Sequence, residues 1–318
     1  MDENNRIIDM KPELSDFRTE VINGLLSTPK KISSKFFYDK EGSEIFDEIT
    51  KLPEYYLTRS EMEILEKRGM DIGRVIGENA TVIELGSGSG KKALLLLRAL
   101  KKTRELVFVD ISVEALKGAM ILIRHEYPQM PVMSICADYT KTDIMEKIDI
   151  SGRKAIVFLG STIGNMEPGD ARTFISGCMR LLSSGETLTI GVDLKKNKSE
   201  LEKAYNDNKG VTARFNLNLI SRINRELGTD IPNGAFIHKA IYNDDLGRIE
   251  MHLESTRRQS FDIAGHEVIF EKGETIHTEN SYKFSIEEFT SMLKTAGFRE
   301  IKILQDEEQK YGLFTATA

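Results

Sequence analysis

The segment VIELGSGSGKKALLLL, residues 82–97, constrains the fold more than any other part of this 318-residue chain. A short apolar run leads into three alternating glycines, and a leucine-rich run with helical character follows them. A glycine loop between a strand and a helix is typical of a ligand site, because backbone without side chains can approach the ligand closely. The segment therefore predicts a ligand against Gly86, Gly88 and Gly90.

Short β-rich runs and amphipathic helices alternate from about residue 80 onward. This alternation is typical of βαβ units and predicts an α/β fold with a doubly wound parallel sheet. The expected strands lie at 80–85, 105–111, 132–138, 154–161 and 187–194, and the expected helices at 91–100, 112–126 and 171–182.

Residues 195–285 break this pattern. Two long helical segments are followed there by β-like stretches, and helical periodicity also occurs before residue 77. The last two segments, FREIKILQD and YGLFTATA, are expected to pair as a closing hairpin. We expect a Rossmann-like domain at 61–194 plus 286–318, and a smaller α+β substrate-binding domain at 1–60 plus 195–285.

The spacing of the glycines excludes two phosphate-binding loops. A Walker A loop needs GxxxxGK[ST], but its first glycine would fall on Leu85 and its hydroxyl residue on Lys92. A dinucleotide fingerprint needs GxGxxG, and its third glycine would fall on Lys91. A ligand without a phosphate group fits the loop better.

The remaining pattern, E-x-G-x-G-x-G, runs from Glu84 through Gly86, Gly88 and Gly90, and it resembles motif I of the class I S-adenosylmethionine methyltransferases. Acids follow at the ends of the next two strands. Asp110 is placed to accept from ribose hydroxyls, and Asp138 is placed to meet the adenine amino group, since ligands lie at the carboxyl edge of an open sheet. A plain tight turn is the alternative interpretation of the loop.

Other segments are more specific and together resemble the histidine-specific N-methyltransferase family over nearly the whole chain. They are FFYDKEGSEIFDEITKLPEYYLTRSE, LGSTIGNMEP, GVDLKK, AYNDNKGVTARFNLN, INREL and TENSYKF. Fungal N-methyltransferases of indole amino-acid derivatives are similar in overall pattern, so family membership alone does not fix the substrate.

The resemblance implies a role for each of a set of residues. Asn165 and Tyr205 correspond to residues that hold the α-amino and carboxylate groups of the substrate, and Tyr38 to an aromatic residue near the amine. Phe46 and Tyr55 correspond to an aromatic wall. The imidazole ring is assigned to Glu279 and Ser281, with Met251 beside it. The cofactor is assigned to Glu84, Gly86, Gly88, Gly90, Lys92, Asp110 and Asp138.

The residues alone leave other interpretations open. Tyr55 reads as a core aromatic residue, and Met251 alternates with Ile249 and Leu253 as a core strand does. Glu279 reads as a solvated strand residue. The chain also departs from the family in its GSGSGKKA loop and at Tyr282, a bulky residue beside the imidazole position that either reshapes the pocket or points away.

Composition narrows the function classes. The net charge of −6 argues against a nucleic-acid partner. The two cysteines, Cys136 and Cys178, lie in apolar segments and are expected to be reduced core residues. The five histidines show no metal-ligand spacing, so no metal is expected. No signal peptide and no apolar run of membrane-spanning length are found, which favours the cytoplasm. The sequence does not determine the oligomeric state, and a monomer is the favoured expectation.

These inferences predict an S-adenosylmethionine-dependent enzyme that methylates the α-amino group of L-histidine three times. The product would be the betaine from which ergothioneine is made, as the resemblance implies. One alternative is the same chemistry on another amino acid or amine, such as a tryptophan derivative. The other is a non-catalytic ligand-binding relative.

Overall fold

The computed structural model describes residues 5–10, 16–141 and 150–318. The chain divides into two compact units. The first contains Leu57–Lys195 and Phe284–Ala318 together with a strand near the N-terminus, and the second contains Lys196–Lys283 together with residues up to Tyr56. No helix among the described residues is both long and apolar enough to cross a membrane.

The first unit is built on one large sheet. Its described strands follow the order β1-β5-β4-β3-β6-β7-β14-β13, with all neighbours parallel except those of β14. Their bounds are β1 Asn5–Asp9, β3 Ala80–Leu85, β4 Thr103–Asp110, β5 Val132–Cys136, β6 Arg153–Phe158, β7 Thr187–Asp193, β13 Ile301–Gln305 and β14 Tyr311–Thr317.

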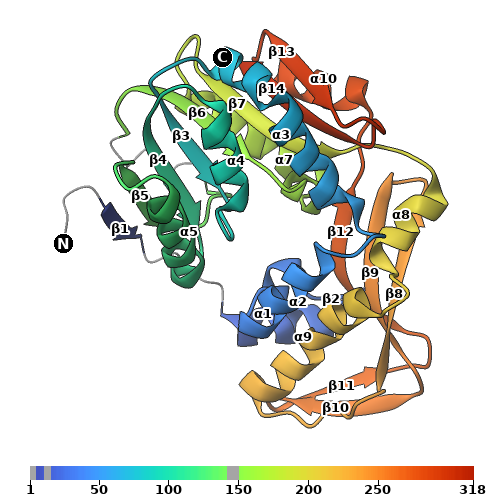
Figure 1. Ribbon diagram of the computed structural model, residues 1–318. Coiled ribbons are helices and arrows are strands. Elements are labelled where there is room, and N and C mark those ends of the chain that lie inside the picture. The colour runs from blue at the N-terminus through green and yellow to red at the C-terminus, as the bar shows by residue number, and fades with distance from the viewer. Residues whose placement is uncertain (1–4, 11–15, 142–149) are drawn as a thin grey trace. The chain divides into compact units, whose positions relative to one another are not determined.

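Helices cover both faces of this sheet: α4 and α5 lie on one face, and α7 and α10 lie on the other (Figure 1). The first unit contains most of α3 Tyr56–Ile76, together with α4 Lys91–Ala99, α5 Val113–Glu126, the 3₁₀ turn η2 Thr162–Asn165, α7 Pro168–Leu181 and α10 Ile286–Thr295. The strand order reverses at β3, whose neighbours are β4 and β6. That reversal is the place where open α/β sheets bind ligands. The predicted α/β doubly wound fold is confirmed.

Each end of the chain supplies sheet strands. The predicted closing hairpin is present, because β13 and β14 pair antiparallel from Ile301↔Ala316 to Gln305↔Gly312. The strand β1 was not expected. It pairs in parallel with β5 in the first unit, whereas the sequence analysis placed this segment with the second domain. A polar five-residue strand at the edge of a parallel sheet carries little hydrophobic pattern by which it could be recognised.

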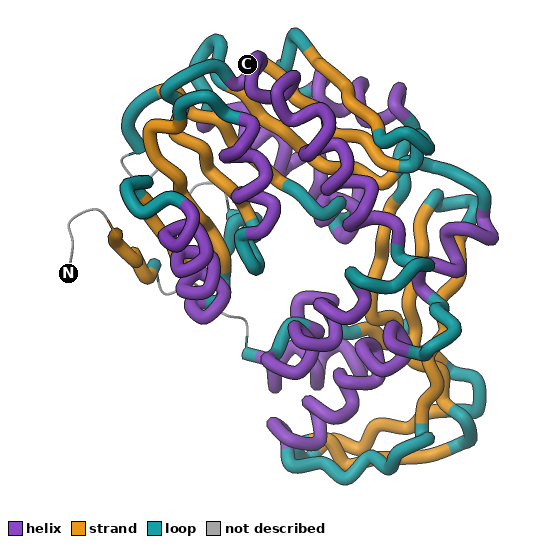
Figure 2. Tube along the Cα trace, viewed as in Figure 1, coloured by secondary structure: helices purple, strands orange, loops and turns teal. Residues whose placement is uncertain are grey.

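The second unit is smaller and mixes helices with strands (Figure 2), and its strand pairs are antiparallel except for β2, which pairs in parallel with β12. Its described strands form a sheet in the order β2-β12-β9-β8 and a separate hairpin of β10 and β11. Their bounds are β2 Lys30–Lys31, β8 Phe236–Asn243, β9 Arg248–Ser255, β10 Gln259–Ile263, β11 His266–Phe270 and β12 Thr275–Tyr282. The helices are α1 Phe17–Leu26, η1 Ser34–Phe37, α2 Lys40–Ile49, α8 Lys198–Tyr205 and α9 Val211–Leu227.

Gly90 is where α4 packs on α5. Its φ of +72° is left-handed, and a Cβ added there would lie 2.9 Å from the Cβ of Ala119 on α5. The last glycine of the loop therefore serves helix packing, while Gly86 and Gly88 stay exposed with φ of +70° and +48°.

Replacing Gly90 by alanine is therefore expected to lower the free energy of unfolding by about 2–4 kcal/mol, through left-handed strain and overpacking against Ala119. Urea denaturation measures this change. Gly118→Ala on α5 is the matched control, since its added Cβ meets nothing within 4 Å. Equal midpoints for Gly90→Ala and wild type would remove the packing argument.

Candidate active site

The glycine loop offers open backbone at the carboxyl end of β3. Gly86 and Gly88 are exposed, and a Cβ on Gly88 would meet nothing within 4 Å. The ring of Tyr139 lies 3.5 Å from where a Cβ on Gly86 would be, so it stands beside the loop. Bare backbone with positive φ and free space in front of it can accept a ligand at close range.

Asp110 ends β4 next to this loop. Its Oδ2 accepts from the backbone N–H of Gly88 at 3.2 Å, and its Oδ1 accepts from that of Ser112 at 2.9 Å. Burial raises the pKa of Asp110, and the backbone donors oppose that rise. The carboxylate thus fixes the loop and has lone pairs left for further donors, as recognition of a ribose diol requires.

Asp138 follows β5 at the same edge of the sheet. Its Oδ1 accepts from the backbone N–H of Thr140 at 3.0 Å and from its hydroxyl at 2.6 Å. The carboxylate is partly exposed and shapes the turn that carries Tyr139. The sequence prediction placed both acids at strand ends, and both lie there.

Glu84 and Lys92 lie in a network of buried charge. Glu84 is 3% exposed, and its Oε2 has no hydrogen-bond partner among the described residues. Burial raises the pKa of Glu84 to about 8, the charges of Glu61 and Asp110 add to that rise, and Lys92 opposes it. A buried polar oxygen without a partner is the kind of group that a bound ligand satisfies.

Lys92 forms an ion pair with a residue of α3. Its Nζ lies 2.5 Å from Oε2 of Glu61, which is fully buried. Both carboxylate oxygens of Glu61 also accept from the backbone N–H of Gly160, and Oε1 accepts from the hydroxyl of Tyr311 at 2.7 Å. The sequence prediction did not include Glu61, because one acid in a charged helix gives no signal of burial.

Asp110→Ala is expected to weaken binding of S-adenosylmethionine about 10- to 100-fold, the range for losing charge-assisted hydrogen bonds to the ribose. Isothermal titration calorimetry measures the change. Glu105→Ala is the control, because Glu105 lies near the amino end of the same strand. An unchanged dissociation constant would refute the role of Asp110.

In the second unit, a continuous row of rings joins all four of the predicted aromatic residues. Tyr38 lies 5.6 Å from Phe46, Phe46 lies 6.3 Å from Tyr55, and Tyr55 lies 6.1 Å from Tyr205, all edge to face. Phe215 on α9 packs against Tyr38 and Phe46 and was not predicted. Edge-to-face packing fixes the positions of the rings, and an uncovered ring face attracts a cation.

A β-bulge decides which way Glu279 points. The register of β12 on β9 shifts between His277, which pairs with His252, and Glu279, which pairs with Met251. The extra residue, Thr278, is held by hydrogen bonds from its hydroxyl to Oδ1 of Asn216 at 2.9 Å and to the carbonyl of Met251 at 3.0 Å. The bulge puts Glu279 on the opposite face of the sheet from His277, as bulges beside functional sites often do.

Glu279, Met251 and Ser281 therefore share one face of the sheet. The hydroxyl of Ser281 lies 2.8 Å from that of Tyr205, so this face continues into the aromatic row. Burial raises the pKa of Glu279 to about 7, and the charge of Lys283 opposes the rise. Lys283 was not predicted, although its spacing of two from Ser281 fits the strand period.

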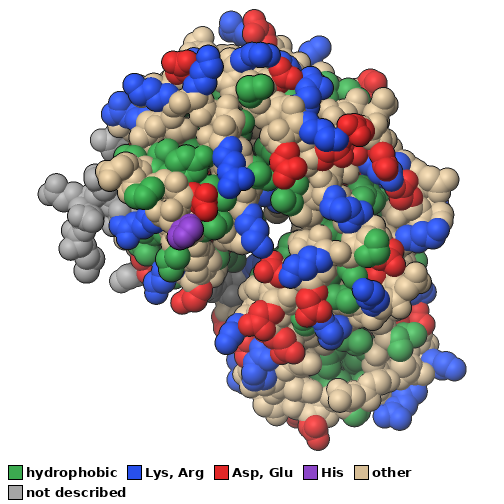
Figure 3. Space-filling model, in the orientation of Figure 1, with side chains coloured by type: hydrophobic (Ala, Val, Ile, Leu, Met, Phe, Trp, Pro, Cys, Tyr) green, Lys and Arg blue, Asp and Glu red, His purple; other side chains and the backbone are tan. Residues whose placement is uncertain are grey.

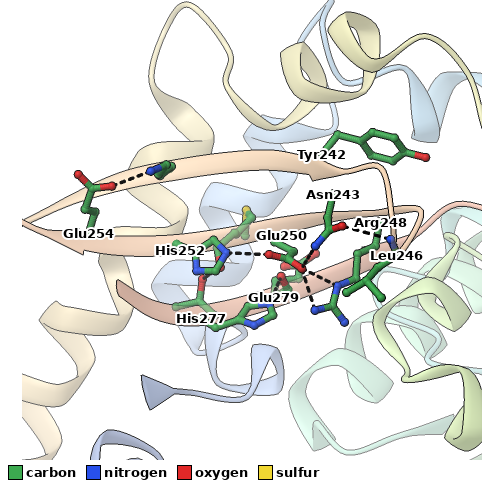
Figure 4. Close-up of polar contacts among 12 residues, drawn as sticks. Tyr242, Asn243, Leu246, Arg248, Glu250, His252, Glu254, His277 and Glu279 are labelled. Atoms are coloured by element: carbon green, nitrogen blue, oxygen red, sulfur yellow. Dashed lines mark hydrogen bonds and ion pairs between the residues drawn. The ribbon is translucent and has the colours of Figure 1, made fainter. Parts of the chain in front are cut away.

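The opposite face of the sheet carries a separate polar cluster (Figure 4). Glu250 accepts from Arg248 at 2.8 Å and lies 3.2 Å from Nε2 of His252, whose ring stacks on that of His277. Arg248 also donates to the hydroxyl of Tyr282 at 2.6 Å. Tyr282 therefore points away from Glu279 and Ser281. Of the two possibilities in the sequence analysis, it does not reshape the pocket at these residues.

Asn165 is the one predicted substrate residue in the first unit. It is the last residue of η2, and it follows the segment after β6 that carries Gly160 and Ser161. Ser161 has a φ of +56°, and its hydroxyl accepts from the backbone N–H of Asp193 at 2.9 Å. A strained turn held by a buried hydrogen bond is frequent at functional sites.

The first unit combines a doubly wound sheet closed by an antiparallel hairpin, a glycine loop at its switch point and an acid at the end of the next strand. These features define a class I S-adenosylmethionine-dependent methyltransferase. Residues 17–318 match the family model described as histidine-specific methyltransferase, SAM-dependent. The chain belongs to this family, and S-adenosylmethionine is its methyl donor.

Curated relatives of the chain come from bacteria and fungi. It is 39% identical over 304 residues to a histidine N-alpha-methyltransferase of Mycobacterium tuberculosis, with 94% of each chain covered. It is 40% identical over 304 residues to one of Mycolicibacterium smegmatis, again with 94% of each covered. It is 31% identical over 281 residues to ergothioneine biosynthesis protein 1 of Neurospora crassa, covering 86% of this chain and 32% of that protein.

Proposed function

We propose that this chain methylates the α-amino group of L-histidine three times and releases the trimethylated betaine. The observation that carries the proposal is the face shared by Glu279, Ser281 and Met251 next to the aromatic row. A carboxylate beside a hydroxyl suits an imidazole with its N–H group, while a phenyl or aliphatic side chain would leave these groups unpaired.

The chemistry is an in-line displacement at the methyl carbon of the sulfonium. The amine nitrogen forms the new N–C bond, the C–S bond breaks, and the first two methylations each release a proton from nitrogen. S-adenosylmethionine supplies the methyl group. The chain's own residues have to position the amine, keep it neutral by excluding water and stabilise the growing positive charge.

The aromatic row supplies the last of these effects. The faces of Tyr38, Phe46 and Tyr55 attract a cation through the ring quadrupole, and the attraction persists for a quaternary ammonium that has no N–H left to donate. Tyr205 and Asn165 are proposed to hold the amino acid by its amino and carboxylate groups. Glu84, Gly86, Gly88, Gly90, Lys92, Asp110 and Asp138 are proposed for the cofactor, with Gly90 acting through helix packing and Lys92 in its pair with Glu61.

We further propose that residues 61–194 plus 286–318 act as the cofactor domain, and that most of the rest binds the substrate. Charged side chains of both signs are intermingled over the face shown in Figure 3, which fits a small-molecule substrate better than a polyanion. A monomer in the cytoplasm remains part of the proposal.

The test is mass spectrometry of purified protein incubated with S-adenosylmethionine and, separately, each of the twenty amino acids, tryptamine and histamine. A gain of three methyl groups on histidine alone is the expected result. Methylation of tryptophan would keep the chemistry and overturn the assignment of Glu279 to imidazole. Cofactor binding without any methylation would favour a non-catalytic relative.

A further inference from the structure

Lys283 is a buried cation next to two residues proposed for the substrate. Its side chain is 2% exposed, and its Nζ donates to the hydroxyl of Ser281 at 2.7 Å and to that of Tyr205 at 3.2 Å. The same ammonium lies 5.0 Å from the centre of the Tyr205 ring. An ammonium is removed from water at a large cost, and these contacts with Ser281 and Tyr205 offset part of it.

The backbone places Lys283 on the same face as Glu279 and Ser281. The ladder of β12 on β9 continues one step past Tyr282, because the N–H of Lys283 donates to the carbonyl of Gly247 at 2.9 Å. Residues at i, i+2 and i+4 of a strand line one face. The three side chains therefore form a stripe that carries a carboxylate at one end and an ammonium at the other.

The ammonium leans back along this stripe. Its Nζ contacts Ser281, which lies one two-residue step along the strand from Glu279. A carboxylate that enters next to the hydroxyl of Tyr205 would meet a donor already oriented by the ammonium.

We propose that Lys283 selects for a free α-carboxylate, so that the chain methylates amino acids and rejects their decarboxylated amines. This inference rests on the proposed function, since it concerns the same substrate face. Lys283 acts through the hydroxyl of Tyr205 and through its own charge, and it is a positioning residue. The stripe then contacts both ends of the substrate, with Glu279 at the imidazole and Lys283 at the carboxylate.

The wild-type protein provides the first arm of the test. Methylation is measured with L-histidine, L-histidinamide and histamine, which differ only at the carboxylate. The expected kcat/KM is about 10- to 100-fold lower for the amide and the amine, the range for losing a charge-assisted hydrogen bond. Equal kcat/KM for all three compounds overturns the proposal without any variant.

The second arm uses Lys283→Met, with Lys283→Arg as the conservative rescue. Lys239→Met is the matched control, because Lys239 belongs to the same sheet and pairs with Glu254 at its exposed surface. For Lys283→Met, the KM for histidine is expected to rise about 10- to 100-fold while kcat/KM for histamine stays unchanged, and Lys283→Arg should recover most of the preference. Binding of S-adenosylmethionine to each variant reports whether it is folded.

Two outcomes count against the proposal. An equal loss of activity toward histidine and histamine would mean that Lys283 acts only through the ionisation of Glu279. An unchanged preference in Lys283→Met would remove the residue altogether. If the wild type methylates tryptophan instead of histidine, the proposed function fails, and the comparison of tryptophan with tryptamine tests Lys283. If it methylates nothing, calorimetry with histidine and histamine decides, and equal or absent binding overturns the inference.

Discussion

Glu279→Ala is expected to reduce kcat/KM for L-histidine by about 100- to 1,000-fold and to leave the affinity for S-adenosylmethionine unchanged. Glu279 is half-buried, and a desolvated carboxylate that accepts from an imidazole N–H contributes several kcal/mol to discrimination, because its removal leaves the donor unpaired. The β-bulge at Thr278 turns this carboxylate onto the face that carries Met251 and Ser281. Steady-state kinetics with histidine and calorimetry with the cofactor make the two measurements.

The matched control is Glu254→Ala. Glu254 lies on β9 in the same sheet and pairs with Lys239 at the surface, so its loss should change kcat/KM less than about twofold. If Glu279→Ala and Glu254→Ala have the same kcat/KM for histidine, Glu279 has no part in substrate binding. If Glu279→Ala loses cofactor affinity as well, the residue acts on the fold as a whole.

The ionisation of Glu279 adds a pH dependence to this prediction. Its pKa is raised to about 7, so the carboxyl group is mostly neutral below pH 7 and mostly charged above it. The neutral carboxyl group of Glu279 therefore stabilises the folded chain at low pH, and this contribution is lost as the pH rises from about 4.5 through 7. The charged carboxylate that accepts from histidine forms over the upper part of the same range. The pH profile of kcat/KM should contain an inflection near pH 7 that is absent in Glu279→Gln.

The cofactor half of the protein could be predicted from the sequence because its signals are local. The glycine loop, Asp110 and Asp138 each stand at the end of a hydrophobic run, and parallel strands bring such ends to one edge. The position of Gly90 against Ala119 could not be predicted, because it depends on how two helices pack. The same holds for the β1 strand, which has too little pattern to be separated from a loop.

The residues proposed to bind the substrate were predicted through family resemblance and not through pattern. From periodicity alone, Glu279 reads as a solvated strand residue, and the bulge that turns it depends on Asn216 far along the chain. Lys283 shows the opposite case. Its spacing from Glu279 and Ser281 already indicated a shared face, but a lysine at a strand end ordinarily lies in solvent, and only the structure shows that it is buried.

Glu61→Ala is expected to lower the free energy of unfolding by about 3–5 kcal/mol, the range for removing one member of a buried ion pair. Glu61 is fully buried and accepts from Lys92, from the backbone of Gly160 and from the hydroxyl of Tyr311. Its removal leaves three donors without their acceptor, one of them charged. Urea denaturation followed by circular dichroism measures the change.

A double-mutant cycle separates the charge from the rest of the network. Glu61→Gln keeps an acceptor for Gly160 but leaves the ammonium of Lys92 uncompensated. The double variant Glu61→Gln with Lys92→Met removes both charges. The double variant should therefore be more stable than Glu61→Gln alone. Glu63→Ala, which breaks an exposed pair with Lys67 on the same helix, should cost less than about 1 kcal/mol. If Glu61→Ala costs no more than Glu63→Ala, the network does not hold α3 to the sheet. A double variant less stable than Glu61→Gln would instead assign Lys92 a stabilising role that does not depend on Glu61.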